Sequence, residues 1–307
     1  MSEKRQGRNA PTFERTPRDI LIGAGLVLFG GVLWGCNATV SKVLMGAYHV
    51  GPLWLACVRE LLAGVLFLIV AGVRSPKLFA GALRDRGNYL HYLVCALVCV
   101  TAVQVAYLSS INWTNAGTAT VLQALNLLFV LAFVCIRGRR LPGLREGIGV
   151  VLAFGGTALI ATGGDPSSLK LPAMGLVWGL VNAAATGAMS ILPVRLVQRW
   201  GNMMVNGIMF VISGLVLLPI VRPWSNPPVF DGLGWALMAF TVALGTFGAF
   251  GLFLAGVMRV GAMRATMLGT SEPIAATVSS VLCLGAVFTP TDLVGFVMIL
   301  AMVFLVR

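Results

Sequence analysis

Ionisable side chains inside long apolar stretches are the residues of this sequence best placed to do chemistry. Arg59 and Glu60 are neighbours in one such stretch, Glu272 stands directly before Pro273 in another, and Lys42 lies toward the end of a third. A charge at membrane depth costs several kcal/mol unless it is paired or hydrated. Each of these charged positions is therefore a candidate for ligand binding, proton transfer or structural anchoring.

Structural and functional interpretations both stay open for these charges. Lys42 can extend to lipid headgroups, and Arg59 is expected to tie helix ends or backbone carbonyls together. The proline after Glu272 removes a backbone donor, so its helix can bend or break there. In that case Thr270, Ser271 and Glu272 would line a polar cavity, whereas an alternative role for Glu272 is to fix the packing of neighbouring helices by hydrogen bonds.

Uncharged polar side chains recur at helical spacing in several apolar stretches. Asn182, Thr186 and Ser190 are four apart, on one helix face with Trp178. Such stripes either form interhelical hydrogen bonds or face a water-filled path. Because Trp34 and Trp178 occupy matched positions in the two halves of the chain, we favour the interpretation that these stripes face a water-filled cavity. The predicted substrate cavity is lined by Trp34, Asn37, Gln104, Tyr107, Gln123, Asn126, Trp178, Asn182, Thr186 and Glu272.

The sequence offers no constellation for catalysis or metal binding. The six cysteines all fall in apolar stretches without metal-ligand spacing, and His49 and His91 lie near opposite ends of their segments. No second acidic residue is close to Glu272 in the sequence. An intramembrane enzyme would need a nucleophile with a base, or a metal cluster. We therefore predict no catalytic residue, no metal and no cofactor.

The composition places these residues in a membrane. Of 307 residues, 58% are hydrophobic and only 10% are charged, whereas soluble domains are nearer a quarter charged. The net charge of +12 would suggest nucleic-acid binding in a soluble protein. Here the positive residues lie between the apolar stretches, so we predict membrane lipid and a small molecule as partners, and no nucleic acid.

Ten apolar stretches are long enough to be candidate membrane spans, since a helix needs about 20 such residues to cross the hydrocarbon core. The fold class is therefore predicted to be all-α integral membrane, with ten transmembrane helices after an N-terminal tail of residues 1–19. The predicted helices are 20–45, 52–73, 89–111, 116–136, 146–163, 173–197, 203–221, 232–256, 265–286 and 290–306.

The arginines and lysines predict the orientation of these spans. Of 22 such residues, eighteen fall in the terminal segments and alternate loops on one side, and only Lys170 and Arg222 fall in loops on the other. Lys42 and Arg59 lie within spans. Positive loops stay in the cytoplasm, so we predict a multi-pass protein of the bacterial inner membrane with both termini cytoplasmic.

A short motif recurs in the two halves of the chain. Gly31, Trp34 and Gly35 are repeated as Gly175, Trp178 and Gly179, at an offset of 144, and an asparagine follows each time. Glycines spaced by four let helices approach closely. The residues given a packing role are therefore Gly31, Gly35, Gly175, Gly179 and Arg59.

This repeat predicts the domain organisation, with a first five-helix repeat at 20–163 and a second at 173–307. Five is an odd number of spans, so the second repeat enters the membrane in the opposite sense. Inverted repeats of this kind suit alternating access to a site near the midplane. The sequence thus favours a transporter over a receptor or scaffold.

The sequence also resembles a known family. The L-W-G-x-N motif at 33–37, Arg59 and the Glu272–Pro273 pair resemble the EamA-type transporters of the drug/metabolite transporter superfamily, from about residue 20 to the end. Among them, the chain looks most similar to the YddG-type amino-acid exporters. It departs from the family in having Gly285 where many members carry a glutamate, and Leu127 in place of a proline.

The resemblance and the expected cavity wall together imply export of amino acids, aromatic and other apolar ones included, or of related small metabolites. A wall of aromatic and amide groups with a carboxylate suits a small zwitterion. Alternatives are an exporter of drugs or other metabolites, or an intramembrane enzyme. Protons are a candidate coupling ion through Glu60 or Glu272, of which Glu272 is preferred, and facilitated diffusion is the alternative.

Overall fold

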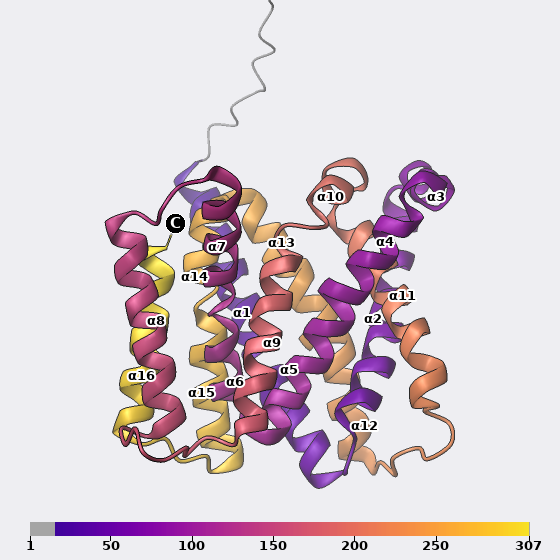
Figure 1. Cartoon of the computed structure of the whole chain (residues 1–307). Coiled ribbons are helices and arrows are strands. Elements are labelled where there is room, and N and C mark those ends of the chain that lie inside the picture. The colour runs from indigo at the N-terminus through magenta and orange to yellow at the C-terminus, as the bar shows by residue number, and fades with distance from the viewer. Residues whose placement is uncertain (1–15, 307) are drawn as a thin grey trace, which may run out of the picture.

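The computed structural model describes residues 16–306, and within them every regular element is a helix and no strand occurs. The N-terminal tail of 1–19 predicted above lies for the most part outside the described residues, as does Arg307. Figure 1 shows the helices standing side by side in one bundle, with α8 and α16 paired at one edge and α2 and α11 at the other.

The helices follow one another with short connections. They are α1 (Pro17–Ala47), α2 (Pro52–Arg74), α3 (Pro76–Arg84), η1 (Arg86–Asn88), α4 (Tyr89–Cys95), η2 (Ala96–Thr101), α5 (Ala102–Trp113), α6 (Ala116–Gln123), α7 (Asn126–Gly138), α8 (Leu144–Thr162), α9 (Ala173–Met189), α10 (Val194–Trp200), α11 (Asn202–Val221), α12 (Gly232–Ala239), η3 (Phe240–Gly248), α13 (Ala249–Val260), α14 (Ala262–Leu268), α15 (Ser271–Leu284) and α16 (Pro290–Leu305).

Eight helical segments among the described residues are long and apolar enough to cross a membrane: Pro17–Ala47, Pro52–Arg74, Arg86–Trp113, Ala116–Gly138, Leu144–Thr162, Asn202–Val221, Gly232–Val260 and Arg264–Leu284. A ninth arises if α9 and α10, bent by 46°, form one span. The predicted helix 173–197 thus corresponds to two helices with a bend that was not predicted, because Pro193 in the break cannot donate a helical hydrogen bond.

The last predicted span, 290–306, corresponds to α16, an apolar helix of 16 residues. At 1.5 Å per residue it is about 24 Å long, less than the roughly 30 Å of a hydrocarbon core. Its start is sharply defined, because Thr289 accepts a hydrogen bond from the amide of Asp292 and Pro290 occupies the first turn.

Two of the spanning segments are broken near the middle of the bundle. Ala116–Gly138 consists of α6 and α7, and Arg264–Leu284 consists of α14 and α15. In the second break the amide of Glu272 donates to the carbonyl of Gly269 at 3.0 Å, a tight-turn bond, and the next residue is Pro273. The break predicted beside Pro273 is confirmed. Backbone breaks at membrane depth occur where they line a cavity.

The repeated glycines lie at close helix contacts. A side-chain carbon added to Gly35 would lie 2.5 Å from the carbonyl oxygen of Glu272, and one added to Gly179 would lie 2.7 Å from Leu122. Additions at Gly31 and Gly175 would collide with Ser271 and Thr114. Only glycine lets α1 approach α15, and α9 approach α5 and α6, this closely.

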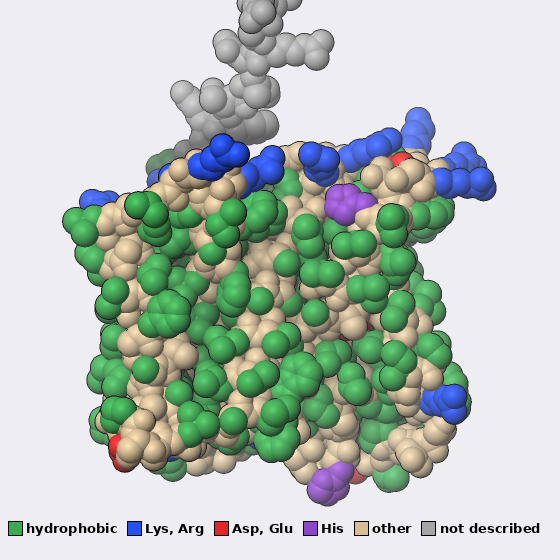
Figure 2. All heavy atoms as spheres, in the orientation of Figure 1, with side chains coloured by type: hydrophobic (Ala, Val, Ile, Leu, Met, Phe, Trp, Pro, Cys, Tyr) green, Lys and Arg blue, Asp and Glu red, His purple; other side chains and the backbone are tan. Residues whose placement is uncertain are grey.

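The surface separates into a charged end and an apolar side. Figure 2 shows lysine and arginine side chains gathered along one end of the visible face, and hydrophobic side chains covering the sides below it. Large apolar residues such as Phe154, Met258 and Val297 are more than half exposed on these sides. An apolar belt of this kind faces lipid. We call the charged end the arginine-rich end.

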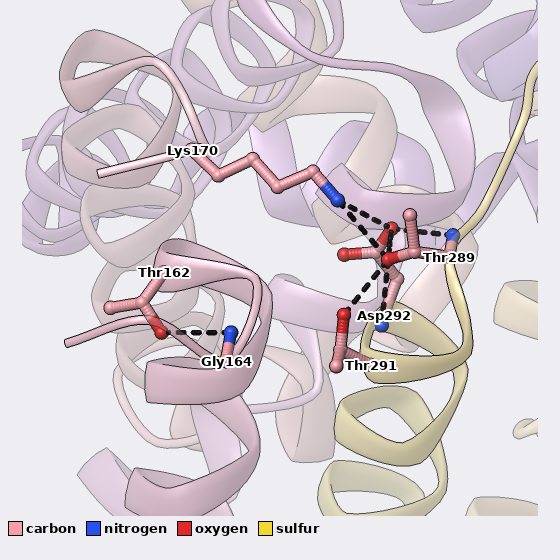
Figure 3. A network of polar contacts seen from close by, with 6 residues as sticks. All are labelled: Thr162, Gly164, Lys170, Thr289, Thr291 and Asp292. Atoms are coloured by element: carbon pink, nitrogen blue, oxygen red, sulfur yellow. Dashed lines mark hydrogen bonds and ion pairs between the residues drawn. The ribbon is translucent and has the colours of Figure 1, made fainter. Parts of the chain in front are cut away.

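A polar network ties the loop between α8 and α9 to the start of α16, at the end away from the arginine-rich one (Figure 3). The ammonium group of Lys170 donates to Thr289 at 3.1 Å and lies 3.8 Å from the carboxylate of Asp292. The Thr289 hydroxyl also donates to Asp292 at 2.7 Å. The network joins the loop between the chain's two halves to its final helix.

Candidate functional site

A central cavity of about 460 Å³ lies between the helices from both halves of the chain. Small-molecule sites usually enclose about 300–1,000 Å³. Its walls come from α1 and α2, the segment from η2 to α7, α9, α11, and the segment from η3 to α16. The breaks between α6 and α7 and between α14 and α15 both lie on these walls.

The cavity brings together most of the residues that the sequence indicated. Eight of the ten predicted positions line it: Trp34, Asn37, Gln104, Tyr107, Gln123, Asn126, Thr186 and Glu272. Trp178 and Asn182 do not. Arg59, to which only a packing role was assigned, lines the cavity as well.

Aromatic rings form one wall. Trp34 packs edge-on against Phe250, with ring centroids 5.1 Å apart, and its ring lies 5.0 Å from that of Phe253. Phe210, also on the wall, packs against Phe250 at 6.2 Å. Edge-to-face pairs at these distances hold one another in place, so the wall is preorganised for an apolar or aromatic group.

Asn37 contributes an unsatisfied acceptor. Its amide nitrogen donates to the carbonyl of Gly245 at 3.3 Å, while its buried side-chain oxygen has no partner within the described residues. A side-chain carbon at Gly245 would lie 2.3 Å from the Asn37 amide carbon. The missing side chain of Gly245 therefore makes room for this amide, and a buried unpaired acceptor attracts a ligand donor.

Arg59 and Gln104 act as one polar group. The Arg59 guanidinium, 2% exposed, donates to the side-chain oxygen of Gln104. Its Nε has no partner within the part of the chain that the structure describes. Glu60 interacts with the guanidinium electrostatically, but no ion pair of Arg59 occurs among the described residues, and a buried guanidinium without one is costly in a membrane. It is therefore positioned to take an anionic ligand group.

A chain of hydrogen bonds orients the amide of Gln123. Asn182 is completely buried and donates to Gln123 at 2.9 Å, and the Thr186 hydroxyl donates to the side-chain oxygen of Asn182 at 3.3 Å. Asn182 and Thr186, predicted to share one face of α9, are thus hydrogen-bonded to each other, but of the two only Thr186 lines the cavity, and Asn182 lies behind Gln123. On the opposite side Tyr107 and Thr120 share a hydrogen bond of 3.0 Å.

Glu272 is the acidic residue of the cavity. It lies in the first turn of α15, directly after the break. Within residues 16–306 its carboxylate has neither a hydrogen bond nor an ion pair with a side chain. A carboxylate at a helix N-terminus is favoured by the helix dipole, and this one is left available to a cationic ligand group or a proton.

Trp178 is half-buried on α9 and takes no part in the cavity wall. The α9 residues that do line it begin at Thr186, eight positions later, which corresponds to a rotation of about 80° and a rise of about 12 Å. Matched positions in the sequence repeat therefore do not give matched positions around the cavity.

The cavity extends toward the arginine-rich end and stops short of the other. Ser190 and Thr266 on its lining are exposed, and both lie close in sequence to arginines of that end. At the other end Lys42 donates three hydrogen bonds to the carbonyls of Ile111, Asn112 and Thr114, at 2.9, 2.7 and 2.9 Å. The expectation that Lys42 extends to headgroups is wrong, because these carbonyls at the C-terminal end of α5 attract it.

Further contacts close the same end. The hydroxyls of Thr39 on α1 and Ser279 on α15 lie 2.6 Å apart. Tyr48 donates to the carboxylate of Asp231 at 2.6 Å, and this hydrogen bond lowers the pKa of the Asp231 side chain below its usual value. Together with Lys42, these contacts hold α1 against the neighbouring helices below the cavity.

An all-helical bundle with an apolar belt, a central cavity that combines aromatic and polar side chains, and helices interrupted at the cavity wall is the architecture of a multi-pass membrane transporter. Comparison with known proteins gives the family. Residues 21–162 and 173–307 each match the EamA-like transporter family, and the chain belongs to this family within the drug/metabolite transporter superfamily.

Its relatives are named as transporters. The uncharacterized inner membrane transporter YicL of Salmonella typhimurium is 30% identical over 280 residues, covering 91% of this chain and 93% of the relative. The uncharacterized transporter YwfM of Bacillus subtilis is 24% identical, covering 89% and 90%. A solved crystal structure with 18% identity superposes with a TM-score of 0.61 over 94% of this chain and 97% of the other, which supports the fold.

Proposed function

We propose that the protein exports amino acids, including aromatic and other apolar ones, across the bacterial inner membrane. The observation that carries this proposal is that Arg59 and Glu272 line one cavity that also holds an aromatic cluster. An arginine suits the carboxylate of a zwitterion and a glutamate suits its ammonium group. Trp34 and its phenylalanine neighbours suit an apolar side chain.

The remaining lining residues have positioning roles in this proposal. Asn37, Gln104, Tyr107, Gln123, Asn126 and Thr186 supply hydrogen bonds to the substrate, either directly or by orienting a neighbour. A molecule that lacks one of the substrate's polar groups leaves a buried polar group of the site without a hydrogen-bond partner. Such a site therefore rejects the molecule strongly. Drugs or other metabolites without both charges would therefore be poor substrates.

The proposed mechanism is alternating access between two inverted five-helix repeats, 20–163 and 173–307, with ten spans and both termini in the cytoplasm. The two family matches have nearly the same bounds. In this proposal the bent pair of α9 and α10 would be a ninth span, and α16, an apolar helix shorter than the eight spanning segments, would be the tenth. The arginine-rich end would face the cytoplasm, so this conformation is the one that loads substrate for export.

Glu272 is the proposed proton-binding group if transport is proton-coupled. It lines the cavity, whereas Glu60 is completely buried and is not among the lining residues. Downhill export by facilitated diffusion is the alternative, and it would leave Glu272 to bind the substrate ammonium alone. In both mechanisms Glu272 binds a transported species, either the coupled proton or the substrate.

Flux of labelled phenylalanine through the purified protein in liposomes tests the proposal. The expected result is uptake above empty liposomes that is competed by other apolar amino acids and abolished in both Arg59→Gln and Glu272→Gln. Asp165→Asn, which alters an exposed carboxylate in the loop between α8 and α9 and touches neither pocket, is the matched control. Transport of sugars or cationic dyes without transport of any amino acid would overturn it.

A further inference from the structure

A second pocket, of about 470 Å³, opens beside the central cavity and has no part in the function described above. It lies between α7, α14 and α16, and we call it the lateral pocket. Its walls are almost wholly apolar, with Val130, Leu131, Val134, Met267 and Val306 prominent. A pocket with these walls is suited to a hydrocarbon chain and unsuited to a polar metabolite.

The mouth of the lateral pocket is cationic. Arg140 lies at it, paired with Glu146 through two hydrogen bonds of 2.7 and 2.8 Å. Arg137, Arg139 and Arg145 are exposed on the same turn between α7 and α8. Four arginines with a single glutamate leave this turn strongly positive. Phosphate groups of lipids at a membrane surface are attracted by such clusters.

The pocket is long enough to hold about two-thirds of the depth of one lipid leaflet, and so the greater part of one acyl chain. From Val134 to Leu127 the α7 helix rises on the order of 10 Å, compared with about 15 Å for half of a hydrocarbon core. Leu127, Thr266 and Val303 belong to both the lateral pocket and the central cavity. An occupant of the lateral pocket would therefore end against the wall of the central cavity.

We propose that the lateral pocket binds one anionic phospholipid of the leaflet at the arginine-rich end. One acyl chain lies between α7, α14 and α16, and the phosphate lies among the arginines of the α7–α8 turn. The bilayer is as apolar as the pocket, so an acyl chain gains no hydrophobic free energy by entering it. Close packing then determines how well the chain is held, and the headgroup charge determines which lipid is selected. The proposal does not depend on which substrate the central cavity carries.

Delipidated full-length protein in detergent tests this site, with native mass spectrometry and thermal unfolding as readouts. Dioleoyl phosphatidylglycerol is expected to give one tightly retained lipid and to raise the melting temperature. Dioleoyl phosphatidylcholine and glycerol phosphate are expected to do neither. Equal effects of the zwitterionic lipid, or of glycerol phosphate alone, would overturn the proposal.

Two pairs of variants locate the bound lipid. Val134→Trp fills the mouth of the pocket, and Ile136→Trp is its control, since Ile136 is 78% exposed and lies outside the pocket. Arg140→Gln removes one positive charge from the mouth of the pocket. Its control is Arg84→Gln, which removes the charge of an exposed arginine on α3. Loss of retained phosphatidylglycerol in the first member of each pair supports the site. Retention in both Val134→Trp and Arg140→Gln refutes it, provided each variant melts cooperatively without lipid.

Discussion

Replacing Lys42 by methionine should release the closed end of the cavity. The substitution keeps most of the apolar stem and removes the ammonium group, which donates to three carbonyls at 2.7 to 2.9 Å. Hydrogen bonds from a charged donor contribute about 1.5–3 kcal/mol each. The three together would exceed about 4 kcal/mol, but the freed carbonyls at the C-terminal end of α5 lie near the end of the bundle and regain water. We therefore expect a net loss of about 2 kcal/mol of preference for the closed arrangement.

A change of about 2 kcal/mol corresponds to roughly a 30-fold shift in a two-state population. The assay is the labelling of a single thiol on the cavity wall by a membrane-impermeant maleimide applied to whole cells. Ala124→Cys supplies the thiol in a variant whose native cysteines are replaced. With Lys42→Met the labelling rate should rise at least severalfold, and at most by the roughly 30-fold shift in population.

Lys170→Met is the matched control, because Lys170 lies at the same end and pairs with Thr289 and Asp292 away from the cavity. It should leave the labelling rate unchanged. An unchanged rate in Lys42→Met, with normal expression of both variants, would show that these hydrogen bonds do not hold the end closed.

Three further predictions follow from the packing and the topology. Gly35→Ala should strongly lower folded yield and flux, because its added carbon would lie 2.5 Å from a backbone oxygen, whereas Gly25→Ala, with open space, should be neutral in both measurements. Trp34→Ala should lower phenylalanine flux several-fold through loss of the aromatic wall, whereas Trp178→Ala should change it little; the reverse order would contradict the cavity assignment. Thiols placed at 164–171 should react with impermeant reagent outside intact cells, and thiols at 137–145 should react only after permeabilisation.

Much of the helical architecture was predictable because apolar length is a strong signal. Stretches such as 52–73 and 203–221 agree with α2 and α11 within one or two residues at each end. The bend between α9 and α10 was missed although Pro193, near the end of the stretch 173–197, is a signal for it, since a proline cannot donate a helical hydrogen bond. Pro273 gave a correct prediction of a break, because a proline inside a polar stretch of an apolar helix removes a backbone donor.

The site was predictable where a polar residue interrupts an apolar stretch. Gln123 and Asn126 illustrate this, since both line the cavity. Direction around a helix was harder to predict. Asn182 shares its stripe with Thr186 but is directed at Gln123, and Trp178 is turned away from the cavity. These outcomes depend on how neighbouring helices rotate, which a single helix sequence does not encode.

Arg59 was assigned to helix packing because an arginine at membrane depth usually binds carbonyls. The signal that could have identified its role is its position on the second span together with Gln104 on the third, two polar groups at similar depth. Lys42 shows the opposite case. Its position near a span end suggested headgroups, and only the tertiary fold brings the carbonyls at the C-terminal end of α5 within its reach.

The central claim is that a zwitterion is bound between Arg59 and Glu272, and substrate analogues test it most directly. Flux of phenylalanine, phenethylamine and phenylpropionate should be compared in the same proteoliposomes. The three share an aromatic group and differ in whether they carry both charges, the cation alone or the anion alone. The account predicts that phenylalanine is transported and that each singly charged analogue moves at least tenfold more slowly, since each leaves one buried charge unpaired. Equal flux of all three, or flux of the amine alone, would contradict it.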